Sequence, residues 1–252
     1  MECKQLESVS ARPDAASLVH DKVLSLLLTE KPGLVLDVPA GEGALAAKAL
    51  ESGFEIRCGD IDVSRFKAQG VECGRVDLNK PWPYASSMFD YVVSIEAIEH
   101  LENPWHVVRE ANRVLKQGGK LIITTPNILT IKSRLSYLLY GYPNYFHYMI
   151  ERDPDRRHDS PIDHINPVGF LELRHILSRN GFRIEVIEAN RYLKRHSVFY
   201  QLLRFLLFSR GRSHVRKDEA KASVRQTLLS AALLFGEILV LKAQKVSDVK
   251  EM

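Results

Sequence analysis

The chain has 252 residues, of which 45% are hydrophobic and 26% are charged. This length and composition predict one α/β domain spanning residues 1–252 and exclude a disordered chain. The three cysteines, Cys3, Cys58 and Cys73, show neither metal-site spacing nor an even number, so we expect reduced thiols in a cytoplasmic protein. The chain has no signal-peptide pattern and no run of about 18 apolar residues, so we expect neither a secretory leader nor a membrane-spanning helix.

Apolar runs typical of buried strands alternate with helical patterns along most of the chain. Asn103 and Pro104 suit the start of one helix, and Gly118-Gly119 suits its end. The alternation predicts a doubly wound α/β fold, with a mostly parallel seven-stranded sheet and helices on both faces. The expected strands are residues 33–40, 54–62, 71–78, 89–96, 120–127, 183–190 and 237–245, and the expected helices are residues 43–53, 104–117 and 168–182.

Residues 128–165 interrupt this alternation. The segment is rich in tyrosine, proline and charged residues. A long connection of this kind inside a compact domain is usually functional. We therefore expect an insertion that lies over the active site as a lid.

The loop after the first expected strand has the sequence DVPAGEGALA. Gly41, Gly43 and Ala46 nearly match the glycine fingerprint of dinucleotide-binding folds, and Asp60 follows near the distance expected of a ribose-binding carboxylate. Asp37 argues against a dinucleotide, because a carboxylate at the end of this strand would repel a pyrophosphate. It would instead attract an ammonium group, which S-adenosylmethionine carries without any phosphate. An NAD-dependent oxidoreductase remains an alternative, although no hydride-transfer constellation is evident.

An acidic residue, a glycine-rich turn and a second acidic residue closing the next strand occur here as Asp37, PAGEG and Asp60. In this pattern, and in the later stretches RVDLNKPWPYASSMFDYVV and VLKQGGKLIITTPN, the sequence resembles the class I S-adenosylmethionine-dependent methyltransferases. The resemblance covers about residues 15–127 well and 162–190 loosely, and it implies a Rossmann-like methyltransferase fold with a reversed last strand. Pro39 departs from the pattern, because it replaces the usual first glycine and removes one N–H donor from the loop.

The resemblance also implies roles for individual residues. Asp37 would orient the methionine amine, and Gly41 and Gly43 would let the backbone approach the ligand. Asp60 would accept hydrogen bonds from the ribose hydroxyls, with Asp62 as a competitor for that role. Asp77 would lie near the adenine amino group. The implied cofactor-binding residues are Asp37, Ala40, Gly41, Gly43, Asp60, Ile61, Asp77, Leu78 and Ile95.

The stretch VVSIEAIEHLENP, residues 92–104, places Glu96, Glu99 and His100 on one face of a helical turn after an expected strand. Ligands bind at the carboxyl ends of strands in such sheets, so these side chains would point into the site. His100 alone could act as a general base for a hydroxyl proton. The three side chains could instead bind a divalent metal such as Mg²⁺ or Mn²⁺. A third interpretation is that Glu99 and His100 only cap or flank the following helix.

The pattern Glu-x-x-Glu-His, followed later by a histidine, resembles two groups of methyltransferases. One group is the metal-dependent 2′-O-methyltransferases of small-RNA 3′ ends, and the other is the ubiquinone-pathway O-methyltransferases. The later histidine here is His164, in DHINPVGF, with His147 and His158 as rivals. The resemblance implies His100 and His164 as catalytic residues, and it implies a metal site made by Glu96, Glu99, His100 and His164.

The net charge of +4 is unevenly distributed. Residues 191–217 contain eight basic residues and no acidic residue. They open a basic, apolar and helical segment, residues 191–235, between the last two expected strands. Residues 196–217 suit a helix lying on an anionic membrane surface, at the inner face of the membrane. A helix packed on the sheet or a dimer contact is the alternative, and nucleic acid is not favoured because aromatic and basic residues are little interleaved.

Together these features predict an S-adenosylmethionine-dependent O-methyltransferase. A diol-bearing acceptor, either a sugar or a quinone-precursor ring, would explain the metal-like cluster. A lipid-linked acceptor would also explain the basic, apolar segment. The alternative from a different class is a protein that binds S-adenosylmethionine or a membrane without catalysis.

Overall fold

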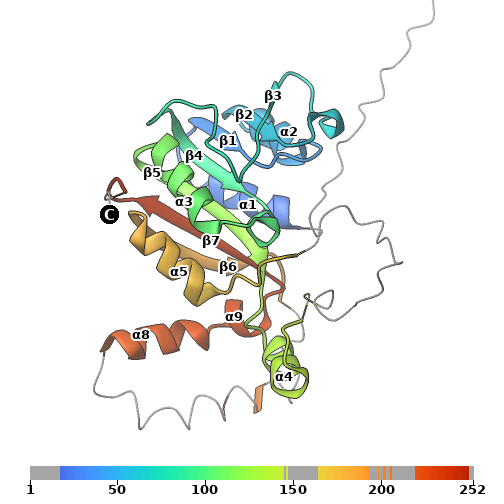
Figure 1. Cartoon of the computed structure of the whole chain (residues 1–252), viewed down its shortest axis with the longest axis vertical. Coiled ribbons are helices and arrows are strands. Elements are labelled where there is room, and N and C mark those ends of the chain that lie inside the picture. The colour runs from blue at the N-terminus through green and yellow to red at the C-terminus, as the bar shows by residue number, and fades with distance from the viewer. Residues whose placement is uncertain are drawn as a thin grey trace, which may run out of the picture.

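The computed structural model describes residues 18–144, 146, 164–192, 198, 201, 202, 205 and 219–249 (Figure 1). The strands are β1 (Leu34–Asp37), β2 (Glu55–Asp60), β3 (Cys73–Arg75), β4 (Phe89–Ser94), β5 (Leu115–Pro126), β6 (Phe182–Ala189) and β7 (Ile238–Lys245). The α-helices are α1 (Val19–Leu27), α2 (Ala44–Glu51), α3 (Pro104–Val114), α4 (Ile131–Tyr140), α5 (Phe170–Arg179), α8 (Glu219–Leu228) and α9 (Ala231–Phe235). Two short 3₁₀ helices are η1 (Val63–Arg65) and η2 (Ile98–His100).

The seven strands form one sheet in the order β3-β2-β1-β4-β5-β7-β6. β1 pairs in parallel with β2 and with β4, and β4 pairs in parallel with β5. β7 runs antiparallel to both of its neighbours, β5 and β6. The predicted seven-stranded, mostly parallel sheet with a reversed last strand is therefore confirmed.

Helices cover both faces of the sheet, as predicted. Successive residues of a strand point to opposite faces, and the core divides accordingly. Leu36 of β1 and Val92 of β4 pack in a cluster with residues of α3 and α5. Their neighbours Val35 and Val93 pack in a second cluster with residues of α1 and α2. β1 and β4 are therefore buried on both sides, which explains their continuous apolar runs in the sequence.

The prediction of a helix at residues 104–117 is wrong at its end. Asn103 does cap the start, because its side chain accepts a hydrogen bond from the His106 N–H at 3.0 Å. The helix ends at Val114, however, and the next residue, Leu115, already pairs with Phe89 of β4. Pairing with β4 therefore takes residues that the sequence pattern had assigned to the helix.

Gly118 and Gly119 lie inside β5 and do not end a helix. Gly118 has φ +80°, and a Cβ on Gly119 would lie 2.9 Å from the carbonyl oxygen of Asp90. The β4–β5 register also shifts between Phe89 and Tyr91. The glycine pair thus permits an irregular, close approach of two strands.

The expected insertion and the expected basic segment are described only in part. Within residues 128–165 the chain forms α4, while residues 145 and 147–163, including His147 and His158, lie outside the described residues. Within residues 191–235, α8 and α9 are helical, whereas most of residues 196–217 lie outside the described part. No helix in the described part of the chain is long and apolar enough to cross a bilayer.

Asn127, directly after β5, ties the sheet to α9. It is 2% exposed, and its amide nitrogen lies 3.0, 3.2 and 2.8 Å from the carbonyl oxygens of Ala232, Leu233 and Gly236. These carbonyls are at the end of α9, where helical partners run out, and that of Ala232 also accepts a hydrogen bond from the Gly236 N–H at 3.0 Å. One side chain therefore satisfies several buried acceptors.

We expect Asn127→Ala to lower the free energy of unfolding by about 2–4 kcal/mol, because it leaves buried carbonyls without a donor. Urea unfolding followed by circular dichroism measures the change. Gln226→Ala, at an exposed position of α8, is the control and should change the free energy of unfolding by less than about 0.5 kcal/mol. An Asn127→Ala protein as stable as this control would contradict the role assigned to Asn127.

Candidate active site

The carboxyl ends of β1, β2 and β4 bring acidic residues to one edge of the sheet. Asp37 is the last residue of β1, Asp60 is the last residue of β2, and Glu96 follows β4. Asp37 is in register with Cys58 on one side and Val93 on the other. These carboxylates therefore lie at the edge where open α/β sheets bind their ligands.

Asp37 is a buried carboxylate, with an exposed fraction of 2%. Burial first, and the nearby Asp60 carboxylate second, raise the pKa of Asp37 from 3.8 to about 8. The charged form of such a group is stabilised by a cation or by hydrogen-bond donors. Asp37 is therefore suited to bind an ammonium group, as the sequence analysis proposes.

Asp60 braces the glycine-rich loop. Its Oδ2 accepts a hydrogen bond from the Gly41 N–H at 2.8 Å, and its Oδ1 accepts one from the Asp62 N–H at 2.9 Å. An ionised carboxylate has about four acceptor positions, so positions remain for two ribose hydroxyls. Asp62, the competitor, is exposed and accepts from the backbone and hydroxyl of Ser64. These contacts favour Asp60 as the ribose ligand.

Both loop glycines have left-handed backbone conformations, with φ +54° at Gly41 and +85° at Gly43. A Cβ on Gly43 would also lie 2.7 Å from side-chain atoms of both Phe66 and Ala68. The family resemblance implies that Gly43 lets a ligand approach the backbone. The structure gives a further reason for this glycine, because the turn and the crossing segment exclude a side chain there.

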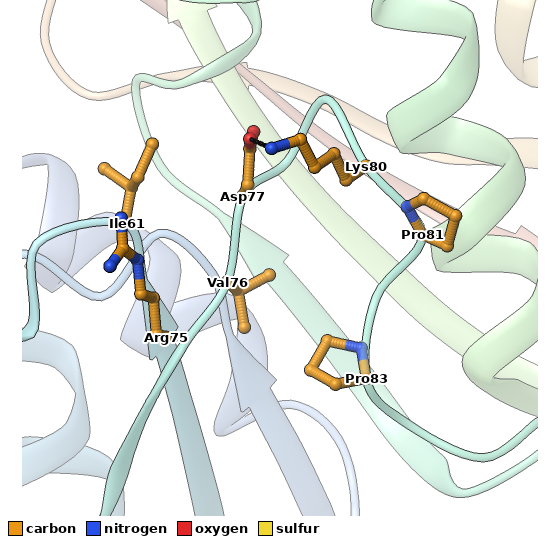
Figure 2. Close-up of a pocket in the computed structure, with 7 residues that line it drawn as sticks. All are labelled: Ile61, Arg75, Val76, Asp77, Lys80, Pro81 and Pro83. Carbon is orange, nitrogen blue, oxygen red and sulfur yellow. Dashed lines mark ion pairs between the residues drawn. The ribbon is translucent and has the colours of Figure 1, made fainter.

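A pocket of about 340 Å³ opens beside the end of β2 and the turn after β3 (Figure 2). Two of the predicted cofactor residues, Ile61 and Asp77, line it. The Asp77 carboxylate accepts a hydrogen bond from the Asn79 N–H at 3.0 Å and pairs with Lys80 at 3.2 Å, and these contacts lower its pKa. The pocket thus offers an apolar contact and an ionised acceptor. Its lining residues are Ile61, Arg75, Val76, Asp77, Lys80, Pro81 and Pro83.

Three other predicted cofactor residues have side chains in the interior. Ala40, Leu78 and Ile95 are 6%, 6% and 7% exposed. Leu78 belongs to the core cluster that contains α3, and Ile95 belongs to the cluster that contains α1. Their side chains fill the core beneath the site, and their direct contact with the cofactor stays a prediction.

Glu96 is held in an uncommon conformation, with φ +47°. Its N–H donates to Thr124 Oγ1 at 2.9 Å, and the Thr124 hydroxyl donates back to Glu96 Oε1 at 3.0 Å. Burial, and after it the neighbouring Glu99 carboxylate, raise the pKa of Glu96 well above its ordinary value. β5 therefore fixes the first acidic residue that follows β4.

Glu99 is completely buried, and only one of its two carboxylate oxygens has a hydrogen-bond partner among the described residues. Its Oε2 accepts a hydrogen bond from the Thr125 hydroxyl at 3.1 Å. Its Oε1 has no hydrogen-bond partner among the described residues and lies 3.9 Å from His100 Nε2. Burial raises the pKa of Glu99 to about 7. A buried oxygen without a partner is costly, so this atom marks a place for a proton or a cation.

His164 lies beside this pair although it is distant in sequence. The centres of the His100 and His164 rings are 4.7 Å apart, and the Phe146 ring is 5.5 Å from His164. The Asn166 N–H donates to the Glu99 carbonyl at 2.9 Å, and the Asn166 side-chain amide donates to the Leu101 carbonyl. Asn166 therefore anchors the segment that carries His164.

The structure brings together three of the four predicted metal ligands. One nitrogen or oxygen from each of Glu99, His100 and His164 lies within 4.8 Å of the other two. Glu96 is not a member of this mutually close set. One carboxylate and two imidazoles are a donor set that divalent transition metals accept.

Thr124, Thr125 and Asn166 were not predicted from the sequence as residues of the site. Thr124 and Thr125 are 0% and 1% exposed near the end of β5, and each donates its hydroxyl to one site glutamate. Two consecutive polar residues directly after the buried apolar run of residues 121–123 were the available signal. Asn166 had no such signal, because its contacts depend on how the chain returns to the sheet.

Comparisons with known proteins agree with this architecture. A family model described as a methyltransferase domain matches residues 11–187. A 27-O-demethylrifamycin SV methyltransferase from Amycolatopsis mediterranei is 27% identical over 124 residues, which are 44% of each chain. A ubiquinone biosynthesis O-methyltransferase from Idiomarina loihiensis is 28% identical over 102 residues, covering 37% of this chain and 42% of that protein. The matches thus span less than half the length of these two relatives.

Solved structures extend the likeness to nearly the whole chain. A SAM-dependent methyltransferase from Archaeoglobus fulgidus has a TM-score of 0.57 at 17% identity, covering 90% of this chain and 94% of that one. At this identity the likeness establishes the fold. With the family match over residues 11–187, the chain belongs to the S-adenosylmethionine-dependent methyltransferases, a family of enzymes.

This family implies S-adenosylmethionine as the methyl donor, and the residues present fit it. The ligand has an amine, a ribose and an adenine. Asp37 is a buried carboxylate that suits the amine, and Asp60 keeps acceptor positions for the ribose. The pocket at Ile61 and Asp77 suits a flat base with an exocyclic amino group.

We expect the affinity for S-adenosylmethionine to peak near pH 8. Asp37, with its pKa of about 8, is mostly protonated at lower pH and must lose its proton to pair with the ligand's ammonium group. Affinity should therefore rise by up to about tenfold per pH unit from about pH 6 to about pH 8. Above that, the ligand's amine, with an ordinary pKa of about 8, loses its proton. Calorimetry at several pH values measures the profile. Asp37→Asn should remove the rise, and an equally steep rise in this variant would contradict the assignment.

We expect Asp60→Ala to weaken binding of S-adenosylmethionine by about 1.5–3 kcal/mol, because charge-assisted hydrogen bonds to the ribose are lost. Asp62→Ala is the matched control, since it removes an exposed carboxylate two residues away, and it should cost less than about 0.5 kcal/mol. Calorimetry at one pH, with thermal unfolding of each variant, separates binding from stability. The opposite order of the two effects would assign the ribose to Asp62.

Proposed function

We propose that this protein transfers the methyl group of S-adenosylmethionine to a hydroxyl oxygen of an acceptor that carries two neighbouring hydroxyls. A sugar or a quinone-precursor ring, free or lipid-linked, has this chemistry. The observation that carries the proposal is the cluster of Glu99, His100 and His164 at the edge of the sheet that also bears Asp37.

The two ends of the site have different tasks. Asp37 and Asp60 hold the amine and ribose of the methyl donor, and Asp77 faces its adenine. S-adenosylmethionine supplies an electrophilic methyl on a positively charged sulfur. The cluster after β4 receives the acceptor, since Glu99 and His100 belong to η2, just beyond the strand that pairs with β1.

The reaction requires removal of one proton. The acceptor oxygen bonds to the methyl carbon while the bond from that carbon to sulfur breaks, and S-adenosylhomocysteine leaves. The hydroxyl proton goes to a base, for which His100 has the appropriate chemistry. Glu99 Oε1, which is 3.9 Å from His100 Nε2, stabilises the imidazolium that results.

Alternatively, Glu99, His100 and His164 would hold a divalent ion, and His100 would then be a ligand and not the base, because a coordinated imidazole nitrogen cannot accept the proton. The buried Oε1 of Glu99, which has no hydrogen-bond partner within the described part of the chain, and the close approach of the three donors support this. Three protein ligands leave coordination positions open, and a bound ion there would acidify and orient a diol. Mg²⁺ and Mn²⁺ suit the carboxylate, and the two imidazoles favour Mn²⁺ over Mg²⁺.

Some of the relatives, but not all, have names that refer to methylation of oxygen. The two relatives described above are a 27-O-demethylrifamycin SV methyltransferase and a ubiquinone biosynthesis O-methyltransferase. Other relatives are N-methyltransferases of ajmaline and of sarcosine or dimethylglycine. We therefore infer that oxygen is the methylated atom from the cluster of Glu99, His100 and His164, and not from these relatives.

Two other functions were considered from the sequence. The family match argues against an NAD-dependent oxidoreductase. A protein that binds S-adenosylmethionine without catalysis would have no use for a buried glutamate beside two histidines. An assay of labelled methyl transfer from S-adenosylmethionine to diol-bearing acceptors tests for catalysis directly.

We expect His100→Ala to reduce methyl transfer by about 100-fold or more while S-adenosylmethionine still binds, because it removes either the base or a metal ligand. His175→Ala, at an exposed position on α5, is the matched control and should retain activity. Excess chelator should inhibit the unsubstituted protein as strongly as His100→Ala does.

Calorimetric titration with Mn²⁺ gives a readout that is independent of activity. The unsubstituted protein and His175→Ala should bind one ion, and His100→Ala and His164→Ala should not. Full activity in chelator, together with loss of activity in His100→Ala, would reject the ion and leave His100 as the base. Full activity of His100→Ala would contradict both roles.

A further inference from the structure

The end of α4 carries an apolar tip that the active site does not use. Its last four residues, Tyr137, Leu138, Leu139 and Tyr140, are 63%, 79%, 68% and 69% exposed. Large apolar side chains exposed consecutively are unusual on a soluble surface. We name these four residues the α4 tip.

The tip is exposed on nearly all sides of the helix. Successive helical residues are about 100° apart, so four consecutive side chains span about 300° of the circumference. A groove on a protein partner contacts one stripe of a helix, at positions such as i, i+3 and i+7. A fluid apolar phase, by contrast, can surround the whole end of a helix.

The root of α4 is firmly held, so the tip projects from a fixed base. Ile131 is 1% exposed and packs in a cluster with Leu229, Leu234 and Phe235 around α9. The Arg134 guanidinium donates to the carbonyl oxygens of Leu129 and Leu228 at 2.8 and 2.7 Å. Figure 1 shows α4 at the same end of the molecule as α8.

The charges around the tip favour an anionic surface. Residues 127–150 contain lysine and arginine but no acidic residue, and Lys132 on α4 is exposed. Residues 191–217 contain eight basic and no acidic residues. Tyr192, the second residue of this segment, bridges to Gly236, which directly follows α9. The basic segment therefore begins near the element that packs on the root of α4.

We propose that the α4 tip inserts into the interface of an anionic lipid bilayer. Leu138 and Leu139 enter the acyl region, and Tyr137 and Tyr140 lie at the level of the head groups, where tyrosine is favoured. Lys132 on α4 contacts the anionic head groups, and the positive charge of residues 191–217 adds to the attraction between the chain and an anionic surface. Val198 and Leu202, which are helical at i and i+4, expose 83% and 56% of their surface and add a second apolar contact.

Membrane docking through this tip would bring the site close to lipids. α4 follows β5, whose Thr124 and Thr125 hold Glu96 and Glu99. A lipid-linked acceptor could then reach the cluster from the bilayer surface. The docking itself does not depend on the proposed reaction.

Flotation of the full chain with vesicles tests the proposal. The vesicles are pure phosphatidylcholine, or phosphatidylcholine mixed with phosphatidylglycerol. The test variant is Leu138→Gln/Leu139→Gln, which keeps a good helix former at both positions. The matched control is Leu50→Gln/Leu171→Gln, which removes two exposed leucines, 43% and 47% exposed, from α2 and α5.

We expect the unsubstituted protein and the control to float with anionic vesicles at low salt, and less at high salt because the charges are screened. The tip variant should partition about tenfold or more weakly. All three proteins should melt alike and bind S-adenosylmethionine equally, since the exchanged side chains are exposed. Three outcomes would overturn the proposal. They are no flotation of the unsubstituted protein, equal flotation of the tip variant, and a dimer that only the tip variant loses in light scattering without any vesicle binding.

Discussion

The parallel pairing of β1 with β2 and β4 is the constraint on which the site depends. It aligns the carboxyl ends of three strands, so Asp37, Asp60 and the Glu96–Glu99 turn must share one edge. Burial makes the charged forms of Asp37 and Glu96 costly, and the carboxylates of Asp60 beside Asp37 and of Glu99 beside Glu96 add to this cost, so the pKa values of Asp37 and Glu96 are raised. A cationic ligand would lower that cost, so this edge of the sheet favours a positively charged ligand.

The acidic residues at this edge form two groups, which different hydrogen bonds hold in place. Thr124 and Thr125 hold Glu96 and Glu99 through hydroxyl hydrogen bonds, whereas Asp60 braces the glycine-rich loop through Gly41. The carboxylates at this edge thus differ in what they can bind, because their hydrogen-bond partners differ. In the proposed function, one group would face the methyl donor, and the other group, which lies beside two histidines, would be where the acceptor hydroxyl loses its proton.

Most of the fold could be predicted from the sequence, and so could the position of Asp37, the glycine-rich loop and Asp60 at one edge of the sheet, because their signals are local. Apolar runs predicted the strands, and Asp37, Gly41, Gly43 and Asp60 lie within one βαβ unit. The end of α3 was wrong, because Gly118-Gly119 is typical of a helix end yet here permits a close approach of β5 to β4. Pairing between strands overrode local preference.

The acceptor half depended on contacts between distant segments. His164 was placed beside Glu99 and His100 by a resemblance, and the structure brings the three together. The contacts that hold it there, from Asn166 to Glu99 and Leu101, have no local sequence signature. The α4 tip was likewise not predicted, because exposure on all sides of a helix end depends on what packs around it.

A crystal structure with S-adenosylhomocysteine and Mn²⁺, with anomalous data at the manganese edge, tests the central claim most directly. The account predicts the ligand amine on the Asp37 carboxylate, the ribose on Asp60 and the adenine in the pocket at Ile61 and Asp77. It predicts one anomalous peak bounded by Glu99, His100 and His164. A ligand whose amine lies away from Asp37, or a cluster without a peak while manganese binds elsewhere, would contradict it.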